Sequence, residues 1–379
     1  MKDGIIMSQR EMKEYRLALK VINNELKLID FAPLISKSYR QAQRIVKAVR
    51  DMDFIGVLHG NYGKSVSNKL PIAFEQQIMQ LLKTKYQGFN LTHFREMLLE
   101  NEGIIVKKTT LEKWAKKHGL TKHRRRNYKT THPPRPRLPQ EGMLVQFDGS
   151  PHLWFGGIPS TLIVAIDDAT GKIRAAEFFK GETSMGGLKI IREIVDEYGI
   201  PEAFYFDQAG IYGKVDRDWT SQIARALEMI HCKLFIASSP QAKGRVERVF
   251  RTLQDRLISE LAFRGIKNFI DANKFLKDSY IHMFNKQFKV EAENPTKAYL
   301  PNVFGDLELI FCRKEQRKIN EGQVFSYGGR MYFVDEKTNH AHRLVNINTH
   351  LDGKISFDIM GRVIKVKEYK KNIRQLKAG

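Results

Sequence analysis

The stretch SSPQAKGRVERVF, residues 238–250, places a single carboxylate among several cations. The acid is Glu247, and the cations around it are Lys243, Arg245, Arg248 and, just beyond the stretch, Arg251. Opposite charges four residues apart on a helix attract only weakly, so this pattern is compatible with an ordinary solvated helix face. It is equally the pattern of a site that holds a metal cation and a polyanion together. The segments before it decide between the two interpretations.

A helix that begins near residue 242 or 243 sorts these side chains onto different faces. Apolar residues recur at helical spacing from Val246 to Leu257 and form the buried stripe. Glu247 shares one flank with Lys243, Arg251 and Gln254. The glutamate and its basic neighbours are therefore expected on the same exposed side.

The region before this helix has the sequence pattern of a β-sheet with interspersed helices. The predicted elements are strands at 144–148, 160–167 and 173–182, a helix at 184–200, a strand at 202–207, a helix at 220–230, a strand at 231–238 and the helix beginning near 242. Asp168 to Lys172 form the turn between the second and third strands. The order is therefore β, β, β, α, β, α, β, α.

Two further acids hold telling positions in this order. Asp148 and Asp207 are each expected to end an apolar strand, where a buried scaffold presents a side chain at a sheet edge. Cleavage or transfer of a phosphodiester needs charge neutralised, which two Mg²⁺ ions about 3.5–4 Å apart achieve with oxygen ligands. Converging carboxylates without a cation would repel. Asp148, Asp207 and Glu247 are therefore the candidate catalytic and metal-ligating residues, with Mn²⁺ able to replace Mg²⁺.

Three motifs carry a family resemblance: FDGS at 147–150, YFDQAG at 205–210 and SPQAKGRVERVFRTLQDRL at 239–257. The chain resembles the DDE transposases and retroviral integrases, and most of all the ISNCY type of bacterial insertion-sequence transposase. The resemblance implies an RNase H-like core, with Asp148 bridging both metals, Asp207 completing one site and Glu247 the other. Integrase-like enzymes commonly follow the second aspartate with Asn-Gly, whereas Gln208 and Ala209 stand here.

The expected fold class is multidomain α and α/β, in five parts. These are a first helix-turn-helix unit at 1–60, a second at 61–120, a basic Pro-rich linker at 121–142, an RNase H-like catalytic core at 143–299 and a small C-terminal β-barrel at 300–379. Hairpin signals at Gly328–Gly329 and Asp352–Gly353 support the last part. A generic three-helix bundle would resemble either helical unit, and a solvated tether would resemble the linker.

The net charge of +22, from 64 Lys and Arg against 42 Asp and Glu, points to a polyanionic partner. Positive charge is concentrated in the segments before 143 and after 299, whereas the centre is nearly balanced. The candidate DNA contacts are Arg40, Gln41, Arg44 and Lys47 on one helix, Lys113 on another, Arg124, Arg125 and Arg126 in the linker, and Lys243, Arg245, Arg248 and Arg251 beside the third acid. Surface ion pairs are the alternative for the last four.

Several other classes of protein lose support. No apolar run of about 18 residues and no signal-peptide pattern is found, so a cytoplasmic, nucleoid-associated protein without a membrane partner is expected. Cys232 and Cys312 stand apart from other metal-ligand residues and are interpreted as reduced thiols. Asp167 and Asp168 are adjacent, so they point to opposite faces and are better explained by the turn than by catalysis.

The function expected from the resemblance is that of a DNA transposase. It would bind the terminal inverted repeats of a mobile element, cleave to a 3′-OH at each end and transfer these strands into target DNA, as a homo-oligomer that brings two ends together. The alternative is a catalytically silent DNA-binding regulator on the same scaffold. A simple Mg²⁺ nuclease is disfavoured, because two helix-turn-helix units suit recognition of defined ends.

Overall fold

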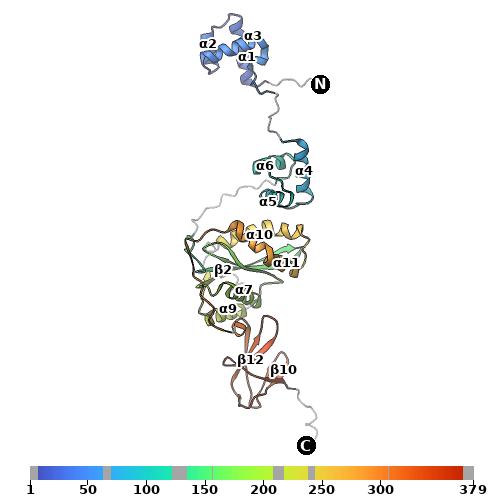
Figure 1. Cartoon of the computed structure of the whole chain (residues 1–379), viewed down its shortest axis with the longest axis vertical. Helices are drawn as coiled ribbons and strands as arrows, with labels where there is room; N and C mark the ends of the chain where they lie inside the picture. The colour runs from blue at the N-terminus through green and yellow to red at the C-terminus, as the bar shows by residue number, and fades with distance from the viewer. Residues whose placement is uncertain are drawn as a thin grey trace. The chain divides into compact units, whose positions relative to one another are not determined.

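The computed structural model describes residues 7–62, 70–121, 135–155, 157–207, 217–237, 244–305 and 307–369. The chain divides into two compact units, Met1–Gln76 and Gln77–Gly379 (Figure 1). No helix in the described ranges is long and apolar enough to cross a membrane.

The first unit contains three α-helices, α1 (Gln9–Ile22), α2 (Leu28–Leu34) and α3 (Tyr39–Met52), followed by a 3-10 turn at Asp53–Val57. Apolar residues from all three helices pack together, including Ala18, Phe31 and Val46. Ser38 begins α3 by accepting a hydrogen bond from the backbone N–H of Gln41, and the Gln41 side chain accepts one from the backbone N–H of Ser38. The predicted trihelical arrangement is therefore present.

The second set of helices is α4 (Ile72–Lys83), α5 (Leu91–Glu102) and α6 (Lys108–Lys117). Asn90 caps α5 through the N–H groups of Thr92 and His93, and Gly103 ends it with a positive φ of 66° that favours glycine. Leu111, Trp114 and Ala115 are the buried residues of α6. All but the start of α4 belongs to the second compact unit.

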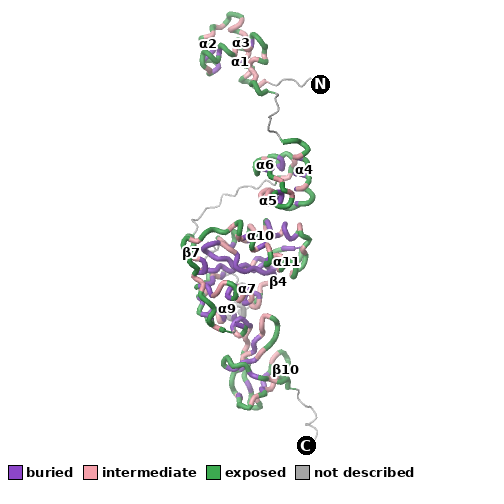
Figure 2. Tube along the Cα trace, viewed as in Figure 1, coloured by how far each residue is buried: buried purple, intermediate pink, exposed green. Residues whose placement is uncertain are grey.

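The centre of the second unit is a five-stranded sheet. Its strands are β2 (Val145–Phe155), β3 (Ile158–Asp167), β4 (Ile173–Phe179), β5 (Ala203–Asp207) and β6 (Lys233–Ala237), in the spatial order β4-β3-β2-β5-β6. The pairs β2–β3 and β3–β4 are antiparallel, whereas β5 lies parallel to both β2 and β6. Buried residues concentrate along these strands (Figure 2).

Helices cover both faces of this sheet. Residues of α7 (Ser184–Tyr198) and α9 (Arg217–Met229) share one apolar cluster with Val145, Phe147 and Phe204. Residues of α10 (Gly244–Phe263), α11 (Phe269–Phe275) and α12 (Ile281–Phe288) share another cluster with Trp154 and Val164. A π-helical turn at Leu276–Tyr280 joins α11 to α12. The observed order β, β, β, α, β, α, β, α is the one predicted from the sequence, and the protein is a mixed helix and sheet protein.

One prediction about the strand that carries Asp148 is wrong. Asp148 was expected to end its strand, but β2 continues to Phe155. The reason is the long antiparallel pairing with β3, which continues past Asp148↔Val164 to His152↔Ser160. Asp148 therefore lies in the middle of a strand, whereas Asp207 ends β5 as predicted.

The end of the predicted linker packs on the central part of the chain. Gln140–Glu141 form a short strand, β1, that pairs in parallel with β7 (Asn294–Lys297). Just before it, the backbone N–H of Leu138 donates to Asp168 and the guanidinium of Arg137 donates to the carbonyls of Asp168 and Ala169. This part of the linker is thus attached to the turn between β3 and β4.

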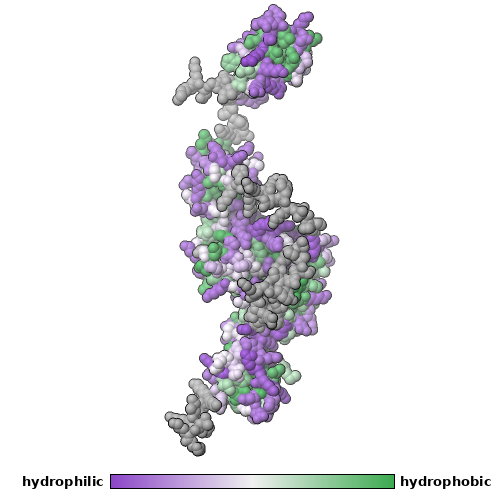
Figure 3. Space-filling view, turned by 180° about the vertical axis from the view of Figure 1, so that it is seen from behind, coloured by the Kyte–Doolittle hydropathy of each residue, from purple (hydrophilic) through white to green (hydrophobic). Residues whose placement is uncertain are grey.

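The C-terminal strands form two small antiparallel sheets and not a closed barrel within the described residues. One sheet has the order β14-β10-β9 and the other β13-β12-β11-β8. Their bounds are β8 (Arg313–Lys318), β9 (Val324–Tyr327), β10 (Arg330–Val334), β11 (Leu344–Thr349), β12 (Ile355–Ile359), β13 (Arg362–Val363) and β14 (Val366–Glu368), after a 3-10 turn at Leu307–Leu309. Both sheets contribute to one apolar cluster. On the face drawn in Figure 3, hydrophilic residues predominate over these sheets.

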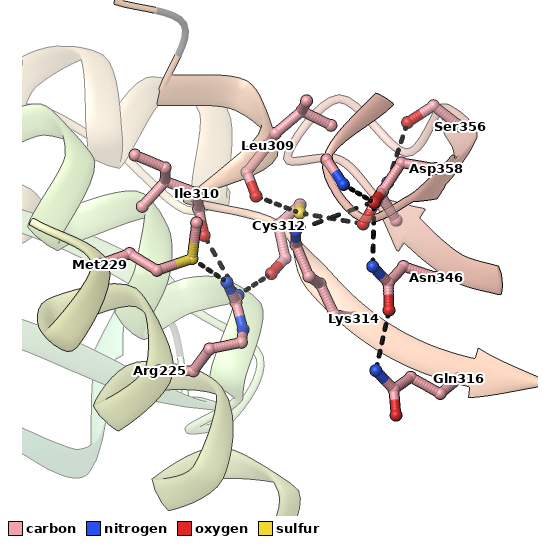
Figure 4. A network of polar contacts seen from close by, with 12 residues as sticks. Arg225, Met229, Leu309, Ile310, Cys312, Lys314, Gln316, Asn346, Ser356 and Asp358 are labelled. Atoms are coloured by element: carbon pink, nitrogen blue, oxygen red, sulfur yellow. Dashed lines mark hydrogen bonds and ion pairs between the residues drawn. The ribbon is translucent and has the colours of Figure 1, made fainter. Parts of the chain in front are cut away.

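Helix α9 explains why the second of these sheets stays open at β8. The Gln222 side chain donates to the carbonyl of Lys314 at 2.8 Å and accepts from its N–H at 2.9 Å. Arg225 donates to the carbonyls of Ile310 and Cys312 at 3.1 and 2.6 Å (Figure 4). Helix α9 thus satisfies the free backbone groups of Lys314 at the start of β8, at the edge where a closed barrel would need another strand.

Candidate active site

Asp148 and Asp207 belong to neighbouring parallel strands, β2 and β5, whose observed pairing stops two residues before them. Val145 pairs with Phe204 and Gln146 with Tyr205. Continuing this register by two residues brings the backbone of Asp148 beside that of Asp207, and neighbouring strands are about 4.8 Å apart. Asp207 also pairs with Ala237 of β6. The side chain of Asp207 lies outside the described part of the structure.

The side chain of Asp148 belongs to the face of the sheet that carries α10. Val145 and Phe147 belong to the cluster on the opposite face, so the alternation along a strand assigns Gln146, Asp148 and Ser150 to the α10 side. Asp148 is half-buried, and its Oδ1 accepts a 3.0 Å hydrogen bond from the N–H of Gly149.

Glu247 lies in the first turn of α10 and is exposed. Val246 and Phe250 bury the neighbouring face of the helix in the apolar cluster, which fixes the side from which Glu247 projects. Seven residues later on the same flank, Gln254 donates to Ser150 Oγ of β2 at 3.2 Å. This hydrogen bond ties α10 to the strand that carries Asp148.

A second tie joins the two elements at the other end. Asp168 follows β3 and its side chain is 0% exposed. Its Oδ1 accepts from Gln146 of β2 at 2.6 Å and also from Arg245 of α10. From Gln146 to Ser150, β2 advances about 13 Å at about 3.3 Å per residue. From Arg245 to Gln254, α10 advances about 13.5 Å at about 1.5 Å per residue. The two contacts are therefore about equally far apart along the strand and along the helix, and Asp148 and Glu247 lie between them.

Arg245 is held by the protein itself. Besides Asp168, its guanidinium contacts the backbone carbonyl of Arg135 at 2.5 Å, and its side chain is only 16% exposed. Burial lowers the pKa of Arg245 from its ordinary value, although the charge of Asp168 opposes that shift. The sequence-based assignment of Arg245 as a DNA contact is therefore not supported by this geometry, because Asp168 and Arg135 already engage it.

The other predicted DNA contacts are placed as follows. Arg248 and Arg251 are exposed on α10, Lys113 is exposed on α6, and Arg40, Gln41, Arg44 and Lys47 are exposed on α3. Arg40, Arg44 and Lys47 follow each other at helical spacing on one face. The side-chain oxygen of Gln41 is used by the cap of α3. Arg124, Arg125, Arg126 and Lys243 lie outside the described residues.

The adjacent acids Asp167 and Asp168 are both engaged in structural contacts. Asp167 is buried and accepts from the N–H and hydroxyl of Thr170 and from the N–H of Gly142. Asp168 binds arginines and the linker backbone. Sequence reasoning explained this pair by the turn but missed Asp168 as a contact of Arg245, because no local pattern links residues so far apart in the chain.

Within the described residues, no group of three His, Cys, Asp or Glu side chains is close enough to hold a metal ion. The side chain of Asp207 is not among those residues, so the full set of three acids is not covered by that finding. The donor types nevertheless suit a hard cation, since all three candidate ligands are carboxylates. Cys232 and Cys312 are free and buried.

Comparisons with known proteins give two curated relatives of nearly full length. One is "Putative transposase y4bF" of Sinorhizobium fredii, 30% identical over 382 residues that cover 98% of this chain and 83% of that protein. The other is "Transposase for insertion sequence IS1202" of Streptococcus pneumoniae, 30% identical over 395 residues that cover 90% of this chain and 84% of that protein. No protein-family model matches the chain.

Among solved structures, similarity is found to retroviral integrases. A simian T-cell lymphotropic virus intasome chain gives a TM-score of 0.34 at 13% identity, covering 76% of this chain and 99% of that one. The HTLV-2 integrase catalytic core in complex with magnesium gives 0.29 at 17% identity, covering 36% of this chain and 82% of that one. At these scores the structural likeness carries no argument of its own.

Proposed function

Because the chain belongs to the insertion-sequence transposases, we propose that it is a DDE-type polynucleotidyl transferase with Asp148, Asp207 and Glu247 as catalytic acids. It binds the terminal inverted repeats of its mobile element, cleaves to a 3′-OH at each end and joins these ends to target DNA. One observation supports this proposal: the register of β2 and β5, continued by two residues, would bring Asp148 level with Asp207, while contacts at Asp168 and Ser150 hold the Glu247 helix against β2.

The three acids are also the proposed holders of two Mg²⁺ ions, which Mn²⁺ can replace. Their oxygen donors fit these hard cations, and neighbouring strands supply two of them at one level. Bound cations would supply charge neutralisation at the reacting phosphodiester. Asp148 lies in the middle of β2, where pairing with β3 holds its backbone, and is the proposed ligand of both ions.

The basic residues divide into two proposed groups. Arg248 and Arg251 are exposed on α10, one and four residues after Glu247, and bind backbone phosphates close to the acids. Lys243 belongs with them by sequence. Arg40, Arg44 and Lys47 on the exposed face of α3, together with Gln41, read or grip the repeat, because a helix of this kind fits the major groove. Lys113 and Arg124, Arg125 and Arg126 extend the contact to the neighbouring backbone.

Assembly is the third part of the proposal. Joining two ends of one element requires two active sites in one complex, so the protein acts as a homo-oligomer on paired ends. The partner is DNA throughout, and the place of action is the bacterial nucleoid in the cytoplasm.

The proposal is tested with purified protein and labelled DNA carrying the inverted repeats that flank its gene, in Mg²⁺ or Mn²⁺. We expect nicks at the element tip and joined products. Asp148→Asn, Asp207→Asn and Glu247→Gln should each reduce cleavage by at least about a thousandfold while repeat binding is kept. Full activity in any of these three variants would refute the assignment of that acid.

Asp196→Asn is the matched control. Asp196 is a carboxylate on α7, on the opposite face of the sheet, and its charge is paired with Arg192 four residues earlier. This substitution removes an acid without approaching α10, so cleavage should be unchanged.

The competing function is a DNA-binding regulator without catalysis. It predicts specific repeat binding by the wild-type protein with no cleavage in either metal. The same experiment therefore separates the two functions, because repeat binding and product formation are measured on the same samples.

A further inference from the structure

A buried carboxylate, Asp168, contacts both of the elements that carry Asp148 and Glu247, β2 and α10. Asp168 is fully buried, and four groups from three segments donate to it. They are the Gln146 side chain of β2, the Arg245 side chain of α10, and the Arg135 side chain and Leu138 N–H of the linker. A buried charge is tolerated only when paired and hydrogen-bonded, and here several donors from separate segments meet that need.

Two of these donors each precede a candidate metal ligand by two residues in the sequence. Gln146 precedes Asp148 by two residues on the same face of β2. Arg245 precedes Glu247 by two residues in the first turn of α10. A single carboxylate therefore connects the segment that carries one acid to the segment that carries another.

The second tie makes the connection directional. Gln254 donates to Ser150 beyond both acids, so hydrogen bonds hold α10 against β2 at two points and oppose sliding along the strand. Without the Asp168 contact, the start of the helix would keep only the Arg245 hydrogen bond to the Arg135 carbonyl and the apolar packing of Val246 and Phe250. Apolar packing is not directional and permits small shifts.

The linker takes part in the same arrangement. Arg135 contacts Asp168 at 2.5 Å through its side chain and Arg245 at 2.5 Å through its carbonyl. Arg137 donates to the carbonyls of Asp168 and Ala169, at 3.0 and 3.2 Å. The chain that arrives from the helical segments thus passes through the contact that holds the start of α10.

We infer that Asp168 and Arg245 are positioning residues that fix Glu247 relative to Asp148, and that the linker residue Arg135 completes this arrangement. The inference rests on the proposed function, since it assigns a purpose to the distance between two of the proposed metal ligands. Arg245 accordingly acts inside the protein and not on DNA. Partners that orient metal ligands typically change metal affinity or activity by about 10- to 100-fold when removed.

The experiment uses the full-length protein with Asp168→Asn, Arg245→Gln and Arg245→Lys, alongside Glu247→Gln. Binding of Mn²⁺ is measured directly by calorimetry, cleavage is measured across a range of Mn²⁺ concentrations, and affinity for repeat DNA is measured separately. We expect Asp168→Asn and Arg245→Gln to weaken Mn²⁺ binding about 10- to 100-fold. Repeat affinity should stay within about twofold, because no DNA contact is removed.

The conservative variant separates positioning from general destabilisation. Lysine keeps the charge that pairs with Asp168 but lacks the planar fork that also reaches the Arg135 carbonyl. Arg245→Lys should therefore recover part of the lost affinity and fall between wild type and Arg245→Gln. A role limited to stability predicts no such graded recovery of Mn²⁺ affinity.

Arg174→Ala is the control for the loss of a buried ion pair. The Arg174 side chain is only 5% exposed and contacts Glu141 at 2.6 Å. Its guanidinium also lies over the ring of Tyr198 of α7, on the face of the sheet away from α10. Arg174→Ala should lower thermal stability without changing the affinity for Mn²⁺ or the Mn²⁺ concentration that gives half-maximal cleavage. Hydrogen exchange in residues 244–251 should rise in Asp168→Asn and not in Arg174→Ala.

The possible results separate failure of this inference from failure of the proposed function. Weaker Mn²⁺ binding in both Glu247→Gln and Arg245→Gln supports the inference. Weaker binding in Glu247→Gln alone, with wild-type values in Asp168→Asn and Arg245→Gln, overturns the inference and leaves the proposed function intact. Unchanged binding and cleavage in Glu247→Gln overturns the proposed site, and the inference with it.

Discussion

Arg256→Ala should loosen the attachment of helix α5 to helix α10. The Arg256 guanidinium contacts Glu96 of α5 at 2.6 and 3.3 Å and lies 5.0 Å from the ring centroid of Phe288. Nearby, His93 of α5 pairs with buried Glu260 of α10 at 2.9 Å. These contacts connect the second set of helices to the same helix that carries Glu247.

The magnitude follows from what the substitution leaves behind. Removing one partner of a buried ion pair costs about 3–5 kcal/mol when the remaining charge is uncompensated. Glu96 is 23% exposed and still accepts a 2.9 Å hydrogen bond from Gln287, so part of that cost is avoided. We therefore expect Arg256→Ala to lower the free energy of opening α5 by about 2–3 kcal/mol, which corresponds to an increase of about 30- to 150-fold in its opening equilibrium constant.

Hydrogen exchange of the α5 peptides is the appropriate assay, because it reports opening of one segment without requiring the whole chain to unfold in a single step. Peptides from α3 provide the internal reference, because neither Arg256 nor Arg192 lies on that helix. Arg192→Ala is the matched control variant, since Arg192 forms an exposed pair with Asp196 four residues later and should change exchange by less than about threefold. Unchanged α5 exchange in Arg256→Ala would refute the reasoning.

The same pair predicts a pH dependence with a definite sign. Burial alone would raise the pKa of Glu96, but hydrogen bonds from Arg256 and Gln287 and the charge of Arg256 leave it below its ordinary value of 4.5. A lowered folded-state pKa gives stability that is present above pH 4.5 and is lost as the pH falls through the folded pKa. The difference in α5 protection between wild type and Arg256→Ala should therefore shrink below pH 4.5. A difference that grows on acidification would contradict this.

Three further predictions concern the C-terminal sheets and the thiols. Gln222→Ala should cost about 1–2 kcal/mol and raise amide exchange at Lys314, because it removes both hydrogen bonds at the edge of β8; protection equal to wild type would contradict this. Burial would raise the pKa of Asp358, yet hydrogen bonds from side-chain amides and the Gly361 N–H leave that pKa lowered. The stability that the Asp358 carboxylate contributes is therefore lost in acid below about pH 3.9. Asp358→Asn should make the free energy of unfolding, measured by denaturant titration, fall less steeply over that pH range. Burial raises the pKa of Cys232 to about 12, so this thiol should resist a disulfide reagent at pH 8 in the native protein and react once it is unfolded; rapid native reaction would show the site to be open.

The order of elements in the central sheet was predictable because it depends on local patterns. Apolar runs, turn residues and helical periodicity each operate within about 5 to 15 residues. The turn at 168–172, the strand end at Asp207 and the cap at Ser38 were all predicted on this basis and are observed. The length of β2 was not, because it depends on pairing with β3, which continues the strand past Pro151.

The C-terminal region shows the same limit. Its hairpins at Gly328–Gly329 and Asp352–Gly353 are present, and these glycines have positive φ values. A barrel was expected because several short strands in sequence favour closure. The strands instead form two sheets, and the free edge of β8 is covered by α9, a helix some ninety residues earlier in the chain.

By itself the sequence determined the identity of the three candidate acids, their order along the chain and the class of fold that carries them, because these depend on motifs and short-range periodicity. Only the tertiary structure decided where the described cations beside Glu247 lie. Arg245 turns inward to Asp168 and the linker, whereas Arg248 and Arg251 remain exposed. The physical reason is that a buried carboxylate must find its partners across the fold, and those partners lie far apart in the chain.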